Sequence, residues 1–244
     1  MSEQPKNLSQ ILTPQFVDAR RPLEFSPAVV CSICDGAGWV ESEGRMRRCE
    51  CLKSQIRSKR QAAFDAEIPN RFRNCSRETW EGPWPLVKAD SWIPQPGKNP
   101  WAMVVWGPPG TGKTHAATAL YRGLLARFEH LTGMWLSNEE MLTRVKSEFG
   151  DRAVTKENLE RVDLLLLDDV GRAKESPFTL DLTRSLLYLR HLNQLPTIIT
   201  SNAQKITDFD AIDPALSDRL SINEGAIHAN FAKKANYRLK GVQG

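Results

Sequence analysis

The chain has 244 residues, and its hydrophobic share of 41% is enough for one sizeable domain with a small appendage. Its formal net charge of +4 defines no partner, although seven Lys or Arg stand against one Glu over 45–60, which suits an anion such as nucleic acid or an ordinary solvated surface. The polar N-terminus and the lack of a long apolar run exclude a signal peptide and a membrane helix, so we expect a cytoplasmic protein with reduced thiols and no membrane partner.

The first 25 or so residues are polar, and we expect them to be poorly ordered or to form one short helix over 8–19. Four of the five cysteines follow, at Cys31, Cys34, Cys49 and Cys51. In a reducing compartment, clustered thiols indicate a metal site rather than disulfides, and four thiolates bind zinc tetrahedrally. We predict structural zinc, with an iron–sulfur cluster and free or oxidised thiols as alternatives, because the closing C-x-C is less usual than C-x₂-C. The fifth cysteine, Cys75, is expected to be a small buried residue.

A basic helix is predicted over 52–68, ending before Pro69, because the residue before a proline avoids the α region. Five prolines over 82–101 predict an irregular connection on the surface. From Trp101 onward, short apolar runs alternate with helical stretches. The predicted strands are 101–106, 133–137, 162–168, 196–201 and 225–231, and the predicted helices are 113–129, 138–149, 155–161, 179–194 and 213–219. Continuous apolar strands that alternate with helices predict an α/β fold, a parallel sheet covered on both faces.

The segment GPPGTGKT carries the strongest signal, because it matches G-x-x-x-x-G-K-[ST] between an apolar strand and a helix. In such a loop, backbone N–H groups and the helix N-terminus surround phosphate oxygens. The loop residues predicted to bind ATP are Gly107, Pro108, Pro109, Gly110, Thr111, Gly112, Lys113 and Thr114. Lys113 is expected to reach the β- and γ-phosphates, and Thr114 to bind Mg²⁺.

Polar residues at two later strand ends complete the predicted site. LLLLDDVG places Asp168 at the carboxyl end of a buried strand, where open α/β sheets bind their ligands. We predict that Asp168 holds Mg²⁺ and that Asp169 polarises the attacking water, with simple capping of the strand end as the alternative. Asn202 follows the strand TIITS and is a candidate for contact with this water or the γ-phosphate, although Ser-Asn is also ordinary turn chemistry.

Several separated motifs together resemble the DnaC/IstB branch of the AAA+ ATPases. They are IPNRFRNCS, GPPGTGKTHAATAL, LLLLDDVG, the arginine six residues before the proline of RHLNQLPTIITSN, DRL and the closing YR, and the resemblance covers about 68–240. It implies a P-loop AAA+ core with a five-stranded parallel sheet and no helical lid, since thirteen residues follow Phe231. We expect two parts, an N-terminal zinc module over 1–67 and the ATPase domain over 68–244. CSICDGAGW resembles the zinc modules in front of helicase-loader ATPases, including phage ones.

The resemblance also assigns arginine roles. It makes Arg219 of SDRL an arginine finger that reaches the γ-phosphate bound by a neighbouring subunit, Arg238 a second sensor arginine at the nucleotide, and Arg190 an arginine facing the subunit interface. A helix-terminal arginine, a basic tail and a solvated helix arginine are the respective alternatives. Asp169 stands where many AAA+ ATPases have the longer Glu, so slow hydrolysis is expected.

The function implied by the resemblance is loading of a replicative DNA helicase onto single-stranded DNA. ATP would be bound and hydrolysed between subunits of a homo-oligomer, as a switch stimulated by assembly or by single-stranded DNA. Two alternatives stay open. One is an IstB-type ATPase helper of DNA transposition, and the other is a zinc-bearing nucleic-acid adaptor whose nucleotide is structural.

Overall fold

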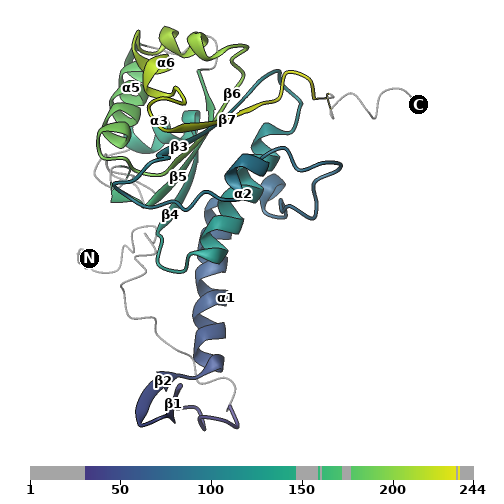
Figure 1. Ribbon diagram of the computed structural model, residues 1–244, viewed down its shortest axis with the longest axis vertical. Helices are drawn as coiled ribbons and strands as arrows, with labels where there is room; N and C mark the ends of the chain where they lie inside the picture. The colour runs from purple at the N-terminus through teal and green to yellow at the C-terminus, as the bar shows by residue number, and fades with distance from the viewer. Residues whose placement is uncertain (1–30, 147–158, 160, 172–176, 235, 237–244) are drawn as a thin grey trace, which may run out of the picture.

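A five-stranded parallel sheet forms the centre of the protein (Figure 1). The structure, a computed structural model, describes residues 31–146, 159, 161–171, 177–234 and 236. The strands are β3 (Ala102–Trp106), β4 (Gly133–Ser137), β5 (Leu164–Val170), β6 (Thr197–Ser201) and β7 (Ala226–Asn230). Their order across the sheet is β4-β5-β6-β3-β7. All five strands were predicted within two residues at each end, and the predicted α/β class is confirmed.

Helices cover both faces of this sheet, which makes three layers (Figure 1). One face carries α1 (Glu50–Glu67) and α2 (Lys113–Arg127), and the other carries α3 (Asn138–Lys146), α5 (Pro177–Leu192) and α6 (Leu216–Arg219). Short 3₁₀ helices lie at Asn70–Phe72, Val87–Ala89 and Ile206–Ala211. Successive strand residues point to opposite faces, so Val105 joins the core under α2 while Val104 joins the core under α5 and α6.

The connection before β3 differs from its expected place on the surface. Leu86, Ala89, Trp92 and Trp101 are all buried. The prolines prevent regular secondary structure, but the large apolar side chains between them still pack into the core. Trp92 also satisfies its indole by donating to the Pro100 carbonyl at 2.7 Å. The surface prediction was therefore wrong at these positions.

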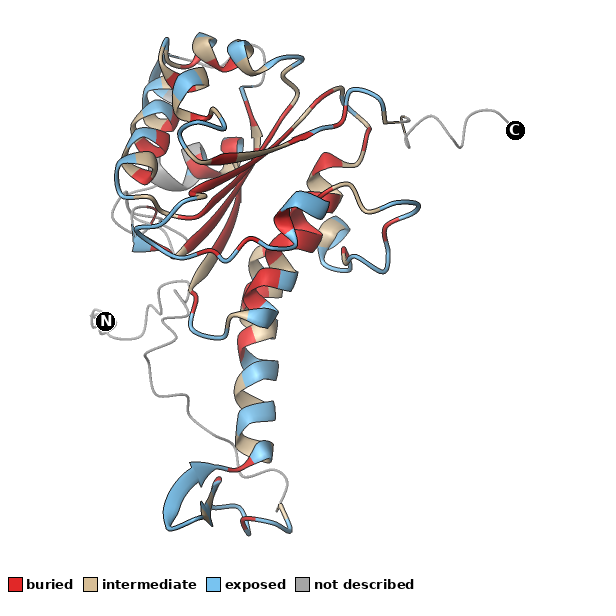
Figure 2. Ribbon diagram, viewed as in Figure 1, coloured by how far each residue is buried: buried red, intermediate tan, exposed pale blue. Residues whose placement is uncertain are grey.

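A long helix separates the cysteine-rich end from the sheet. Figure 1 shows α1 extending away from the sheet with a small hairpin at its far end, and Figure 2 shows that burial along α1 is concentrated in its last turns. Phe64 and Ile68 lie in the core there. The helix was predicted over 52–68, and it ends before Pro69 as expected. No described helix is long and apolar enough to cross a membrane.

The hairpin pairs β1 (Trp39–Ser42) with β2 (Arg45–Arg48) antiparallel. Its two-residue turn uses Glu43 and Gly44, both at positive φ, as tight hairpins require. The short helix expected over 8–19, the end of the helix expected over 138–149 and most of that expected over 155–161 fall outside the described residues.

Candidate functional site

The phosphate loop joins the carboxyl end of β3 to the first residue of α2. Gly107 has φ 138°, and a Cβ there would lie 2.9 Å from the carbonyl carbon of Phe231, just beyond β7. Gly112 has φ 88° and immediately precedes α2, where the first N–H groups lack helical partners. The glycines thus permit a tight loop that ends on a helix N-terminus, a place suited to phosphate.

Three of the predicted catalytic residues form one hydrogen-bonded chain. The buried Lys113 donates from Nζ to the Pro108 carbonyl at 2.7 Å and to Asn202 Oδ1 at 2.9 Å. Asn202 in turn donates from Nδ2 to Asp169 Oδ1 at 2.6 Å. The structure therefore brings together side chains from the loop, the end of β6 and the end of β5.

Asp168 lies beside this chain and is buried. Burial raises its pKa, while hydrogen bonds from the Thr200 and Thr114 hydroxyls act in the opposite direction. The same Thr200 oxygen accepts the backbone N–H of Asp169 at 2.9 Å, so one side chain holds the Asp168 carboxylate and the Asp169 backbone. Hydroxyl and carboxylate oxygens are the ligands that Mg²⁺ prefers, so Thr114 and Asp168 fit that ion. Thr200 was not predicted, and its only sequence signal is a polar residue near the end of an apolar strand.

A cavity of about 750 Å³ opens over these residues, large enough for a nucleotide. One wall is the loop with the two aspartates, and a second wall comes from residues 71–81, with Arg71, Phe72, Cys75, Thr79 and Trp80. His115, next to the loop, also lines the cavity and places its ring centroid 5.5 Å from that of Trp80. Sequence reasoning missed this wall, because the motif IPNRFRNCS supported the family resemblance without assigning any residue a role.

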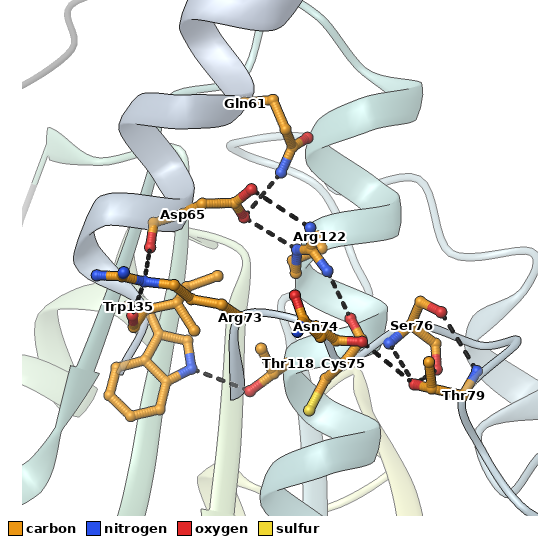
Figure 3. Close-up of polar contacts among 11 residues, drawn as sticks. Gln61, Asp65, Arg73, Asn74, Cys75, Ser76, Thr79, Thr118, Arg122 and Trp135 are labelled. Atoms are coloured by element: carbon orange, nitrogen blue, oxygen red, sulfur yellow. Dashed lines mark hydrogen bonds and ion pairs between the residues drawn. The ribbon is translucent and has the colours of Figure 1, made fainter. Parts of the chain in front are cut away.

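One ion pair and two hydrogen bonds connect this wall with α1 and α2. Figure 3 shows Arg122 of α2 between Asp65 of α1 and the backbone of Cys75. Its Nε lies 3.0 Å from Asp65 Oδ1, and its Nη1 donates to the Cys75 carbonyl at 2.9 Å. Gln61 donates to the same Asp65 oxygen. Cys75 is buried as predicted, and burial raises its pKa to about 11, so the thiol stays protonated.

The predicted arginine finger, Arg219, lies away from this cavity within its own chain. Arg219 does not line it, and instead its Nη1 donates to Asp213 Oδ1 at 2.8 Å while its Cζ lies 5.0 Å from the centre of the Tyr188 ring. Arg238 lies outside the described residues.

The structure contradicts both environments predicted for Arg190, a subunit interface and a solvated helix surface. It is fully buried, so it neither faces a subunit interface nor lies in solvent. Its Nε donates to Thr197 Oγ1 at 2.8 Å, its Nη1 to the Leu159 and Val162 carbonyls, and its Nη2 to the Pro196 carbonyl. Burial lowers its pKa to about 9, still above neutral, so it remains a cation that ties α5 to the strand ends.

The four clustered cysteines form a second candidate site at the far end of α1. Their Sγ atoms all lie within 4.8 Å of one another. The Cys34–Cys51 and Cys31–Cys49 sulfurs are 3.4 and 3.9 Å apart, too far for disulfides of about 2.05 Å. A zinc tetrahedron with bonds of about 2.3 Å needs sulfurs about 3.8 Å apart, so the cluster fits that metal. Backbone N–H groups of Ile33 and Cys34 lower the pKa of Cys31 to about 7, whereas the hydrogen bond with Cys34 raises the pKa of Cys51. Cys31 is therefore the thiol most ready to bind a metal, and Cys51 would have to give up its proton to the ion.

The fold and the cavity define a P-loop nucleotide-binding protein of the AAA+ type. A family described as "IstB-like ATP binding protein" matches residues 92–227, more than half of the chain. The chain therefore belongs to this family, in the DnaC/IstB branch of the AAA+ ATPases, as its motifs predicted. Membership implies a bound nucleotide with Mg²⁺.

Curated relatives and solved structures agree with this placement. The chain is 26% identical over 181 residues to the replicative helicase loader DnaC of Escherichia coli strain K12, which covers 69% of this chain and 73% of that protein. It is 30% identical over 155 residues to the phage-like element PBSX protein XkdC of Bacillus subtilis strain 168. This match covers 58% of this chain and 56% of that protein. The crystal structure of DnaI shares the fold with a TM-score of 0.55 at 20% identity, over 73% of this chain and all of that one. The crystal structure of the DnaC helicase loader shares the fold with a TM-score of 0.52 at 23% identity, over 66% of this chain and 99% of that one.

Proposed function

We propose that the chain is an ATP-dependent replication protein that loads a replicative DNA helicase onto single-stranded DNA. ATP hydrolysis rests on one observation, the hydrogen-bonded chain from Lys113 through Asn202 to Asp169 inside a nucleotide-sized cavity. Helicase loading rests on the similarity to the loader of Escherichia coli. The two parts are testable separately.

The chemistry follows from what each side chain can do. Lys113 now bonds to two neutral oxygens, and anionic phosphate oxygens would bind its ammonium more strongly. Asn202 keeps its bond to Asp169 and so orients that carboxylate, which accepts the proton of the attacking water. Thr114 and Asp168 would hold Mg²⁺, which would neutralise charge on the phosphates.

Hydrolysis between copies of the chain is supported by the position of Arg219. The cavity of one chain has no contribution from Arg219, which lies on α6. An arginine added by a neighbouring copy would stabilise the charge of the transition state, a contribution of about 10³–10⁵ in rate in related hydrolases. Assembly would then switch the ATPase on, as loading requires.

The cysteine cluster supports a partner-binding role for the end of α1. Zinc would hold together a hairpin that has little core of its own. Figure 1 shows this end well away from the sheet, and every residue of the basic strand β2 is exposed. We propose that it contacts the helicase or the DNA while the AAA+ domain hydrolyses ATP.

A transposition helper is the second candidate, because the matching family is named for IstB. The cysteine module, which resembles those of helicase loaders, favours loading. An adaptor with a structural nucleotide is disfavoured by the oriented Asp169.

The test uses the replicative helicase of the same organism on circular single-stranded DNA that carries an annealed oligonucleotide and is coated with single-strand binding protein. We expect unwinding to depend on this chain and ATP, and to be lost with Lys113→Ala. Stimulation of a transposase from a neighbouring gene, without any effect on the helicase, would support the second candidate. Binding of ATP without turnover in either assay would support the adaptor.

A further inference from the structure

Arg219 is held on two sides by residues from other elements. Asp213 Oδ1 accepts a hydrogen bond from Arg219 Nη1 at 2.8 Å. The ring of Tyr188 on α5 lies against the face of the guanidinium, with its centre 5.0 Å from Arg219 Cζ. Asp213 is itself fixed, because the same Oδ1 accepts the Ala215 N–H and its carbonyl accepts the Leu216 N–H, both at 2.8 Å. Guanidinium groups stack well on aromatic faces, so the two contacts together fix both the plane and the edge of this group.

The guanidinium keeps most of its donors available despite being fixed. It has five N–H donors, and among the described residues it donates only to Asp213. Arg190 is the opposite case, since all three of its nitrogens donate within the chain. The Arg219 side chain is also 25% exposed, whereas Arg190 is fully buried. Arg190 is satisfied by its own fold, and Arg219 is oriented with N–H groups left for another acceptor.

The surroundings of Arg219 suit contact with another protein. Tyr188 is 44% exposed, Leu192 one turn further along α5 is 61% exposed, and Ile222, just after α6, is 65% exposed. Tyr and Arg are enriched at the energetic centres of interfaces, and exposed apolar side chains beside them mark a contact surface. A positive group on this surface would complement the phosphates of a nucleotide held in a cavity like the one over Asp168 and Asp169. In an assembly, a second copy of this chain would offer that cavity.

We propose that Tyr188 and Asp213 are positioning residues, which hold Arg219 so that its remaining N–H groups reach the nucleotide bound by a second copy. This inference rests on the proposed hydrolysis between copies. Removing the ring would let the guanidinium leave its position while leaving ATP binding intact. A stacking contact of this kind corresponds to about a tenfold effect on kcat.

The test uses mixtures of two variant chains and introduces Tyr188→Leu into one of the two chains at a time. Arg219→Ala chains supply a working cavity without the arginine, and Lys113→Ala chains supply the arginine without a working cavity. Mixing them should restore part of the ATPase activity. Adding Tyr188→Leu to the Lys113→Ala chain should lower the restored kcat about tenfold without changing KM. Adding it to the Arg219→Ala chain should change nothing, because that chain supplies no arginine.

Matched variants separate positioning from folding. Tyr188→Phe keeps the ring and should restore as much activity as the parent pair. Phe178→Leu removes another exposed aromatic from the same helix and should have no effect on either side. Asp213→Asn keeps an oxygen for the Ala215 N–H but loses the charge, and should lower activity only from the Lys113→Ala side. The thermal unfolding midpoint of each chain, together with the ATP affinity of the chains that keep Lys113, shows whether it is folded.

The outcomes distinguish this inference from the function on which it rests. No activity from the unmodified mixture, in samples shown to assemble together, would refute hydrolysis between copies. Full recovery with Tyr188→Leu on the Lys113→Ala chain would refute the positioning role alone. An equal loss from both sides would also refute it, because the ring would then serve the fold or the contact surface instead of Arg219.

Discussion

Lys113 Nζ and Asn202 Oδ1 lie 2.9 Å apart, although 89 residues separate them in the chain. The parallel sheet makes this possible, because β3 and β6 are neighbours and both present their carboxyl ends at the same edge. Asn202 also donates a hydrogen bond from Nδ2 to Asp169 Oδ1 at the end of β5. One amide thus joins the residue predicted to hold phosphate to the residue predicted to orient water.

Removing this amide should affect turnover more than binding. Asn202→Ala leaves Asp169 without its 2.6 Å donor, so we expect kcat to fall about 10²-fold with ATP affinity nearly unchanged. Steady-state ATPase assays at concentrations where the chain assembles measure this. Asn193→Ala is the matched control, because among the described residues that amide donates to the Leu189 carbonyl near the end of α5 and lies away from the cavity. A rise in KM alone would show that Asn202 binds ATP without orienting the carboxylate.

Asp169→Asn tests the carboxylate itself. The amide has the same size, and Thr114 with Asp168 still provides the oxygens expected to hold Mg²⁺, so ATP affinity should stay within about twofold. Loss of the proton acceptor should lower turnover about 10²–10⁴-fold. Calorimetric ATP binding and single-turnover hydrolysis measure the two effects separately. Normal hydrolysis by this variant would place the water-activating role on another residue.

The sequence predicted the parts of the site that depend on short-range pattern. The phosphate loop and Asp168 each lie at the end of an apolar run, so their strand-end positions follow from local sequence. The strand order could not be derived in this way, because apolar runs of similar length and composition can pair in several orders. It came from the family resemblance, and the contact between Lys113 and Asn202 depends on it.

The residues that were missed or misplaced depend on long-range packing. Nothing near Trp80 in the sequence indicates that it closes a cavity against a loop some thirty residues later. Arg190 has the charge of an exposed helix residue, and its burial is favourable only because the Leu159, Val162 and Pro196 carbonyls converge on it. Such convergence is a property of the packed fold.

Arg190→Met should destabilise the fold without any direct effect on the cavity. It would take the Arg190 donor away from the buried Leu159 and Val162 carbonyls, whereas the Pro196 carbonyl keeps the Leu165 N–H, and we expect the free energy of unfolding to fall by about 3 kcal/mol. Arg184→Met on the same helix is the control, because its ion pair with Asp181 is exposed and should contribute less than about 1 kcal/mol. Urea unfolding of both variants measures the difference. Equal stabilities would show that the Arg190 hydrogen bonds give no net stabilisation.

The cysteine cluster should hold about one zinc ion, to be measured by elemental mass spectrometry on reduced protein. Chelation should expose four thiols to a thiol reagent, with Cys31 reacting first because its pKa is lowered to about 7 and Cys51 last because its pKa is raised. The fifth, Cys75, should react slowly, because a pKa of about 11 leaves roughly 10⁻⁴ of it as thiolate at pH 7. Its rate should rise about tenfold per pH unit until the pH approaches that pKa. Iron in the sample, or five thiols of equal rate before chelation, would contradict the assignment.

Alanine substitutions at Gly107 and Gly123 should change the free energy of unfolding in opposite directions. A Cβ at Gly107 would lie 2.9 Å from the Phe231 carbonyl carbon and 3.0 Å from the Ala232 nitrogen, and both belong to backbone that cannot rotate away. Gly107→Ala should therefore displace the loop, weaken ATP binding about tenfold or more and lower the free energy of unfolding by about 1–3 kcal/mol.

Gly123 lies inside α2, and a Cβ there would meet no atom within 4 Å. Gly123→Ala should therefore raise the free energy of unfolding by about 0.5–1 kcal/mol through helix propensity and leave ATP binding unchanged. Calorimetric binding and urea unfolding apply to both variants. Because the added methyl group is the same, the difference between them measures the close contact with the end of β7 together with the backbone strain of an alanine at φ 138°. Parental ATP affinity in Gly107→Ala would mean that the loop binds phosphate without that contact, and the steric reason for this glycine would be wrong.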